Sequence, residues 1–254
     1  MIKKALDLSG KNALVTGSSQ GIGAAIALGL AEFGANVLIH YHAKSDKAEA
    51  VADQVRAMGV NAAIIDGDLA ESNAAAQMHR KAIDAFGTID ILVLNASIQR
   101  PKLWQETTSE EFDEQVTANW KVTLELIQLF ATEMVERGWG RILTIGSVQE
   151  EKPHPTMIVY AGTKAAVANT VKNLALQLAG KGVTVNNLSP GVIDTARTDE
   201  PTPPVDETIS QRMTIPLDGE GDPVDCAPMA LLLCSDAGRY ITGQSIFVDG
   251  GMSL

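Results

Sequence analysis

The sequence predicts an α/β protein in which a doubly wound parallel sheet of about seven strands carries helices on both faces. Short apolar runs rich in β-branched residues alternate with longer segments of helical periodicity along the whole chain, which is typical of βαβ units. The chain has 254 residues, of which 45% are hydrophobic, and a chain of this size can bury one large core. We therefore expect one domain that spans residues 1–254.

The expected strands are short apolar runs bounded by glycine, proline or polar residues. Each run is four to six residues long, which is the usual length of a buried strand. The runs comprise residues 12–16, 36–40, 61–66, 89–94, 141–146, 184–188 and 245–248.

The expected helices lie between these runs, where apolar residues recur every three or four positions. Ile22, Ile26 and Leu30 belong to one such pattern, and Val122 and Leu126 belong to another. Each helix is expected to make a right-handed crossover between parallel strands. Residues 195–221 differ, because prolines interrupt them and acidic residues are frequent. We expect an insertion there that covers the substrate, with a solvated loop as the alternative.

Charge and composition exclude several classes of protein. The formal net charge is −11, and no dense run of Lys or Arg offers a surface for nucleic acid or anionic lipid. The first ten residues lack the apolar segment of a signal peptide, and no later run approaches the ~20 apolar residues that span a bilayer. We therefore expect a cytoplasmic protein. Cys226 and Cys234 lack the spacing of a metal site or a redox pair, so we expect buried thiols and no metal.

The first expected strand leads directly into a glycine-rich turn and a helix, a combination that binds phosphate groups. The turn reads Thr-Gly-Ser-Ser-Gln-Gly-Ile-Gly over residues 16–23. Its glycines let the backbone approach a ligand closely, and the N–H groups at the start of the helix attract a pyrophosphate. We therefore expect a dinucleotide cofactor bound by Gly17, Ser19, Gln20, Gly21, Ile22 and Gly23.

The end of the second expected strand bears on the choice between NAD(H) and NADP(H). Sheets of this kind that bind NAD(H) usually have an acidic residue there, which binds the ribose hydroxyl groups. This chain has His-Tyr-His-Ala-Lys-Ser over residues 40–45, so a 2′-phosphate would meet no negative charge, and His42, Lys44 and Ser45 offer donors to it. We expect Tyr41 and His42 at the cofactor and NADP(H) as the favoured form, although Lys44 would equally suit a solvated position.

Two residues on one later helix suggest acid/base chemistry. Tyr160 and Lys164 are four positions apart, so their side chains leave the same face of the helix. A free tyrosine has a pKa of ~10, and a nearby ammonium group lowers it. Tyr160 would then give its proton to a carbonyl oxygen as hydride arrives, and Ser147, just after the fifth expected strand, would hold that oxygen. Taken singly, each residue also suits a structural role, as a core tyrosine, a solvated lysine or a turn serine.

The order of these motifs resembles the classical short-chain dehydrogenase/reductase family over essentially the whole chain. The resemblance rests on the TGxxxGIG spacing of residues 16–23, on Gly-Asp-Leu at 67–69, on Asn-Ala-Ser at 95–97, and on the order of Asn119, Ser147, Tyr160 and Lys164. Leu94 and Ser97 depart from the family's pattern, which has Asn and Gly there. The resemblance implies a Rossmann-type fold and an NAD(P)-dependent oxidoreductase that interconverts a secondary alcohol and a ketone.

The same resemblance implies further roles for individual residues. Asp68 would bind the adenine, and Asn119 would reach Lys164 through a water molecule. Asn186 and residues 190–195 resemble the segment that contacts the nicotinamide. The long helices around Val122 and Val167 would pair between subunits of a homotetramer, although apolar faces would equally suit packing on the sheet. The cofactor site implied in this way adds Asp68, Leu69, Asn95, Ala96, Ser97, Tyr160, Lys164, Pro190, Gly191, Val192 and Thr195.

The loops around the expected site indicate the substrate. They are polar and contain Gln99, Arg100, Gln149, Glu150, Glu151 and His154, whereas a pocket for an acyl chain or a steroid would be mainly apolar. We therefore expect a small polar substrate such as a sugar, a sugar acid or an oxo acid, although loop side chains of this kind often only face solvent. The alternative enzyme is a 3-oxoacyl thioester (acyl-carrier-protein) reductase. The alternative of another class is a non-catalytic dinucleotide sensor, which would typically lack Tyr160 and Lys164.

Overall fold

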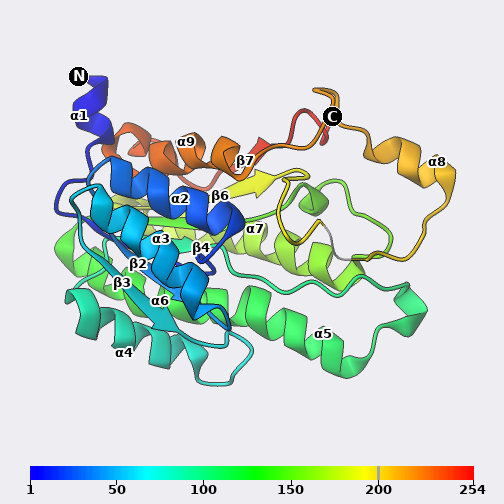
Figure 1. The fold of residues 1–254 in the computed structure, drawn as a ribbon, viewed down its shortest axis with the longest axis horizontal. Coiled ribbons are helices and arrows are strands. Elements are labelled where there is room, and N and C mark those ends of the chain that lie inside the picture. Colours follow the sequence, from blue (N-terminus) through cyan, green and yellow to red (C-terminus); the bar gives the residue numbers. More distant parts are fainter. Residues whose placement is uncertain (199–200) are drawn as a thin grey trace.

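A computed structural model describes residues 1–198 and 201–254. Its centre is a seven-stranded sheet with the strand order β3-β2-β1-β4-β5-β6-β7, and every neighbouring pair is parallel. Figure 1 shows the sheet between two layers of helices. The strands are β1 (Asn12–Val15), β2 (Asn36–Tyr41), β3 (Ala62–Asp66), β4 (Ile91–Leu94), β5 (Gly140–Ile145), β6 (Val183–Pro190) and β7 (Ser245–Val248).

All seven expected strands are present, so the predicted fold class is confirmed. Their ends differ from the expected ends by one or two residues. The fourth strand begins at Ile91 rather than at residue 89, although the backbone of Asp90 already hydrogen-bonds Asn12 and Arg141 on the two neighbouring strands. The sixth strand extends to Pro190, because β7 continues to pair with it as far as Val248.

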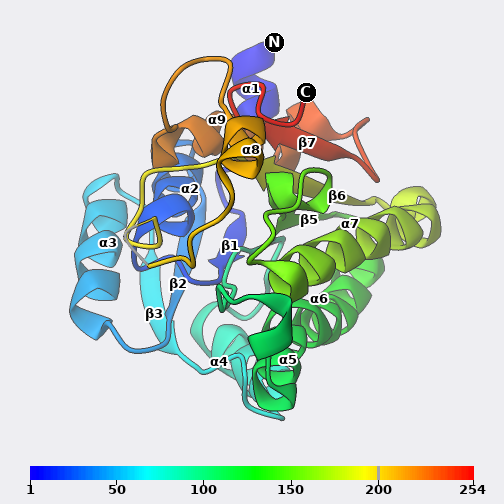
Figure 2. The ribbon, with the colours of Figure 1, turned by 90° about the vertical axis from the view of Figure 1, so that its right-hand side faces the viewer.

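Helices cover both faces of the sheet (Figure 2). Each face has its own cluster of buried apolar side chains. One face carries α2 (Gly21–Glu32), α3 (Ser45–Ala57) and α9 (Pro223–Cys234). The other carries α4 (Ala74–Phe86), α6 (Val122–Arg137) and α7 (Ile158–Leu178). Burial of apolar side chains on both faces explains why the strands have near-continuous apolar runs rather than alternating ones.

The remaining helices are short. They are α1 (Ile2–Leu6), α5 (Ser109–Val116), α8 (Glu207–Ser210) and the 3₁₀ turns at Trp104–Glu106, Val148–Glu150, Ala179–Lys181, Gln211–Met213 and Asp236–Gly238. Thr108 and Glu111 form a capping box that fixes the start of α5, since each side chain satisfies a free backbone N–H group. A π-helical turn at Thr117–Lys121 joins α5 to α6, so the helical segment from α5 to α6 is not α-helical throughout.

The fold creates a crevice at one end of the sheet. The chain leaves β1 toward β2 on one side, whereas β4 lies on the other side of β1. Ligands of open α/β sheets bind at the carboxyl ends of the strands where the order reverses in this way. In Figure 1 the helix α8 lies at the right, at the same end of the molecule as the C-terminus. Residues 199 and 200, part of the expected insertion, lie outside the described residues.

Within residues 1–198 and 201–254, no helix combines the length and the apolarity needed to cross a membrane.

Candidate active site

A cleft of about 1090 Å³ lies at the carboxyl ends of the strands. Two residues of the predicted site, Gly23 and Asn119, stand behind its wall rather than in it. The other predicted catalytic and cofactor residues line it: Gly17, Ser19, Gln20, Gly21, Ile22, Tyr41, His42, Asp68, Leu69, Asn95, Ala96, Ser97, Ser147, Tyr160, Lys164, Pro190, Gly191, Val192 and Thr195.

The glycine turn has no room for side chains. Gly17 and Gly21 have φ angles of 62° and 58°, a backbone conformation that costs little only for glycine. A Cβ atom on Gly23 would lie 2.5 Å from the backbone oxygen of Gly17. Asn95 supports the turn from β4, since its side-chain amide donates to the backbone oxygens of Thr16 (2.9 Å) and Gly17 (3.1 Å). The turn thus forms a backbone cradle at the start of α2, and this cradle fits a pyrophosphate.

His40 holds the other side of the same turn, a role that the sequence analysis missed. Its Nδ1 accepts a hydrogen bond from the backbone N–H of Gly17 at 3.0 Å, and its Nε2 lies 3.0 Å from the backbone oxygen of Gly67. The Nδ1 contact requires an unprotonated nitrogen, so Nε2 carries the proton and donates to Gly67. Burial lowers the pKa of His40 to about 4, which keeps the ring neutral near pH 7.

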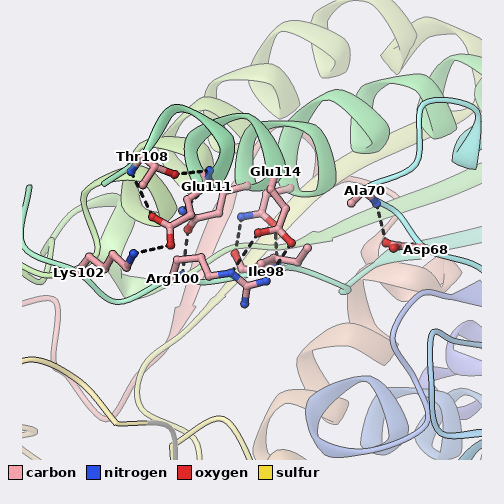
Figure 3. A network of polar contacts seen from close by, with 10 residues as sticks. Asp68, Ala70, Ile98, Arg100, Lys102, Thr108, Glu111 and Glu114 are labelled. Atoms are coloured by element: carbon pink, nitrogen blue, oxygen red, sulfur yellow. Dashed lines mark hydrogen bonds and ion pairs between the residues drawn. The ribbon is translucent and has the colours of Figure 1, made fainter. Parts of the chain in front are cut away.

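Two lysine side chains lie at the end of the cleft where the sequence predicts the adenosine of the cofactor. Tyr41, His42 and Lys44 line it as expected, and Lys47 from the first turn of α3 joins them. The Lys47 ammonium donates to the Gln20 side chain at 2.9 Å, which places it against the glycine turn. Asp68 follows the neighbouring strand β3, where Gly67 donates to the Tyr41 backbone oxygen at 3.0 Å, and its side chain accepts a hydrogen bond from the backbone N–H of Ala70 (Figure 3).

Tyr160, Lys164 and Ser147 meet at the other end of the cleft. Tyr160 is 7% and Lys164 5% exposed, and the Lys164 ammonium donates to the backbone oxygen of Ile145 at 2.6 Å. Burial raises the pKa of the Tyr160 phenol, but the charges of Lys164 and Arg197 and hydrogen bonds from Ser147 and Ser97 outweigh it, so the pKa lies below the usual value. Burial lowers the pKa of Lys164.

Ser97 and Arg197 complete this end of the cleft. Ser97 stands where the family pattern has glycine, and its hydroxyl hydrogen-bonds Tyr160 beside that of Ser147. Arg197 reaches from the loop after β6 and donates to the Ser97 hydroxyl at 3.0 Å and to the Ser97 backbone oxygen at 2.6 Å. Arg197 was missed by the sequence analysis, because no spacing rule relates a loop arginine to a serine 100 positions earlier.

Asn119 lies in the π-helical turn, a feature that often marks functional sites. Its side-chain oxygen accepts from the backbone N–H of Ile98 at 2.7 Å, and its side-chain nitrogen donates to the Ile98 oxygen at 2.8 Å and to the Thr163 hydroxyl at 3.1 Å. Asn119 therefore joins the loop after β4 to the helix that carries Tyr160 and Lys164. Its contact to Lys164 through water stays a prediction.

The segment after β6 is only partly as expected. Pro190, Gly191, Val192 and Thr195 line the cleft. Asn186 does not, because its side chain donates to the backbone oxygen of Ile241 at 2.8 Å and accepts from the N–H of Gln244 at 3.1 Å. Asn186 thus fixes the chain before β7 rather than a nicotinamide ring.

The polar residues expected around the substrate fall into two groups. Arg100 forms an ion pair with Glu114 at 2.9 Å (Figure 3), and the Glu150 carboxylate accepts hydrogen bonds from Asn187 and Ser189 behind the cleft. Glu151 is exposed and does not line the cleft. Gln99, Arg100, Gln149 and His154 line it. The loops around the cleft therefore place only part of their polar side chains in its wall.

Comparison with known proteins agrees with this geometry. Residues 17–253 match the model of a protein family described as Enoyl-(Acyl carrier protein) reductase. A 3-oxoacyl-[acyl-carrier-protein] reductase FabG of Staphylococcus aureus is 39% identical over 245 residues, which are 96% of this chain and 98% of the relative.

Solved structures show the same fold. An Agrobacterium tumefaciens 3-oxoacyl (acyl-carrier-protein) reductase with NADP bound has a TM-score of 0.90 and 35% identity, with 99% of this chain and 97% of that one covered. A gluconate 5-dehydrogenase of Burkholderia cenocepacia in complex with NADP and tartrate has a TM-score of 0.87 and 32% identity, with 100% and 99% covered. The fold, the ordered motifs and these relatives together show that the chain belongs to the short-chain dehydrogenase/reductase family of NAD(P)-dependent oxidoreductases.

Proposed function

We propose that this protein uses NADP(H) to interconvert a ketone and a secondary alcohol on a small, hydroxylated substrate such as a sugar, a sugar acid or an oxo acid. The observation that carries the proposal is the polar character of the cleft wall near Ser147, where Gln99, Gln149 and His154 line the cleft. A small number of polar side chains of this kind orients a ligand through hydrogen bonds. Substrate hydroxyl groups offer partners to such side chains, whereas an acyl chain does not.

The catalytic roles follow from the arrangement of the hydroxyl groups. When bound, the nicotinamide supplies a hydride to the carbonyl carbon or removes one from the alcohol. In the direction of reduction, Tyr160 donates its proton to the carbonyl oxygen, while the Ser147 hydroxyl donates a hydrogen bond to the same oxygen. The buried charge of Lys164 stabilises the phenolate that remains on Tyr160. In the direction of oxidation, that phenolate takes the proton of the alcohol.

The buried catalytic pair also separates this protein from a non-catalytic dinucleotide sensor, since a sensor has no need of an acidic phenol beside the cofactor. The second candidate function is a 3-oxoacyl thioester reductase. The 39% identity with FabG of Staphylococcus aureus favours it, whereas the tartrate in the Burkholderia cenocepacia relative, a hydroxylated acid, favours a polar substrate. A cytoplasmic location and a homotetramer stay predictions of the sequence.

A substrate screen tests the proposal. We expect purified protein with NADPH or NADP⁺ to give its highest kcat/KM on sugars, sugar acids, polyols or oxo acids. 3-Oxoacyl thioesters and their hydroxy products serve as the comparison set. A higher kcat/KM for the thioesters would replace the proposed substrate class with the second candidate, and the reaction type would be unchanged.

The preference for NADP(H) gives a separate prediction. Lys44 and Lys47 line the adenosine end of the cleft and are exposed, and no acidic residue occupies positions 40–45. Replacing both lysines with methionine is expected to weaken NADPH binding about 10-fold, since two charge-assisted contacts to the 2′-phosphate are lost. Binding of NADH, which lacks this phosphate, is expected to change less than 2-fold, a bound that follows from the small effect of exposed charges.

Cofactor fluorescence measures both affinities. Lys181→Met removes a charge from an exposed position outside the cleft and serves as the matched control. Equal weakening of NADPH and NADH in the double variant would contradict a 2′-phosphate contact.

A further inference from the structure

Arg197 stands next to the reacting groups without being part of the family's motifs. Its Nη1 and Nη2 atoms donate to the hydroxyl and the backbone oxygen of Ser97 at 3.0 and 2.6 Å. The Ser97 hydroxyl in turn lies beside the phenol of Tyr160 and lowers its pKa. One hydroxyl group therefore separates the guanidinium of Arg197 from the atom that donates the proton.

The charge of Arg197 is not balanced within residues 1–198 and 201–254. Its guanidinium is half-buried and has no carboxylate within 4.0 Å among these residues. Lys164 adds a second positive charge nearby, and burial together with the charge of Arg197 lowers the pKa of Lys164. A half-buried cation beside another cation is unfavourable unless an anion joins them.

Arg100 offers the contrasting case in the same cleft. Its guanidinium is exposed and forms two contacts with the Glu114 carboxylate, at 2.9 and 3.1 Å (Figure 3). Arg100 is thus neutralised by Glu114 of α5, whereas Arg197 makes only neutral contacts among the residues that the structure describes. Of the two arginines that line the cleft, Arg197 is the one prepared for an anionic ligand.

We propose that Arg197 binds a carboxylate group of the substrate, so that the ketone or alcohol acted on belongs to an oxo acid or a hydroxy acid. This inference rests on the proposed function and narrows its substrate class. These contacts set the distance between the substrate carboxylate and the reacting carbon. Tyr160 gives its proton to the reacting oxygen, and the Ser97 hydroxyl lies between Tyr160 and Arg197. The carboxylate therefore lies within a few carbon atoms of the reacting carbon, as in a short hydroxy acid or a sugar acid.

The cofactor is the other source of anionic groups. Its pyrophosphate has a cradle of its own in the backbone of the glycine turn, which Asn95 and His40 hold in place. Arg197 instead contacts Ser97, which the Tyr160 phenol also contacts. This placement favours the substrate over the pyrophosphate, and the experiment below separates the two.

The test compares ligands that differ only in the carboxylate. Binding of D-gluconate and of D-glucitol, its uncharged counterpart, is measured by calorimetry on the protein saturated with NADP⁺; tartrate and threitol form a second pair. We expect the wild type to bind the acids at least 10-fold more tightly than the alcohols. Arg197→Met is expected to weaken acid binding about 10- to 100-fold, which corresponds to the loss of a charged hydrogen-bonded contact, and to leave alcohol binding within 2-fold, since no charge is involved.

Two further variants make the result decisive. Arg212→Met removes an arginine from an exposed position of the same segment outside the cleft and is expected to keep the full preference for acids. Arg197→Lys is expected to keep part of it, since the charge remains but the paired donors are lost.

Several results would overturn the inference. Equal binding of acids and alcohols by the wild type would do so, as would an equal loss of both ligands in Arg197→Met. A loss of NADPH affinity in Arg197→Met that matches the loss of acid binding would assign the arginine to the cofactor. Binding is measured without turnover, so the absence of activity on every polar substrate in the screen would refute the proposed function while the carboxylate site is still tested.

Discussion

Replacing Tyr160 with phenylalanine is expected to lower kcat by about 10²- to 10⁴-fold, the range that a positioned acid/base group contributes. The phenol hydroxyl is the only atom removed, while the ring still packs beside Lys164, whose ammonium lies 5.5 Å from the ring centroid. Cofactor affinity is expected to stay within about 2-fold, because the glycine turn lies at a distance from this hydroxyl and is held by other residues. Steady-state kinetics and cofactor fluorescence measure the two effects.

The pH profile gives the same prediction a second readout. Alcohol oxidation needs the phenolate, and the pKa of Tyr160 lies below its usual value, so kcat of the wild type rises with pH and levels off before a free tyrosine ionises. The residual activity of Tyr160→Phe is expected to lack this rise.

Tyr240→Phe is the matched control, because Tyr240 is fully exposed and lies outside the cleft. Wild-type turnover in Tyr160→Phe would contradict the acid/base role, whatever the effect on binding.

The sequence predicts the parts of this molecule that depend on local pattern. Seven apolar runs became seven strands, since parallel strands buried on both faces need continuous apolar residues. The spacing of Tyr160 and Lys164 places both on α7, because a helix brings every fourth residue to one face. The glycine turn is equally local, since strand, turn and helix start lie within residues 12–32.

Contacts between distant segments could not be predicted in this way. Arg197 reaches Ser97 across 100 positions of sequence. The direction of the Arg197 side chain depends on a loop, and the loop sequence has no periodic pattern that would predict it. The π-helical turn around Asn119 has no sequence signal of its own, since it only adds one residue to a regular helical pattern. Asn186 belongs to a strand as expected, yet the register of β6 turns its side chain toward the chain before β7.

His40 also makes contacts that the sequence pattern does not predict, with Gly17 and Gly67. This residue is expected to make the stability of the protein depend on pH. Its folded pKa is lowered to about 4 by burial, whereas an unfolded histidine has a pKa of about 6.5. The unfolded chain therefore binds the proton more readily. The stabilisation is fully present above pH 6.5 and is lost as the pH falls toward 4. Between pH 7.5 and pH 5 the loss from His40 amounts to about 2 kcal/mol of unfolding free energy.

Urea denaturation at these two pH values measures this loss, at one protein concentration and without cofactor. Every other titrating group contributes equally to the pH dependence of the wild type and of His40→Gln. The difference between the two proteins in lost unfolding free energy therefore isolates the contribution of His40. The variant is expected to lose about 2 kcal/mol less than the wild type over this range, because glutamine has no proton to gain.

Equal losses in the wild type and in His40→Gln would show that His40 is not neutral and buried in the folded protein. The expected result has a consequence for the cofactor, because a protonated His40 no longer accepts the hydrogen bond from the N–H of Gly17. The glycine turn then loses one of its supports, while Asn95 still holds the Gly17 oxygen. NADPH affinity is therefore expected to weaken at pH 5 more in the wild type than in His40→Gln, before either protein unfolds.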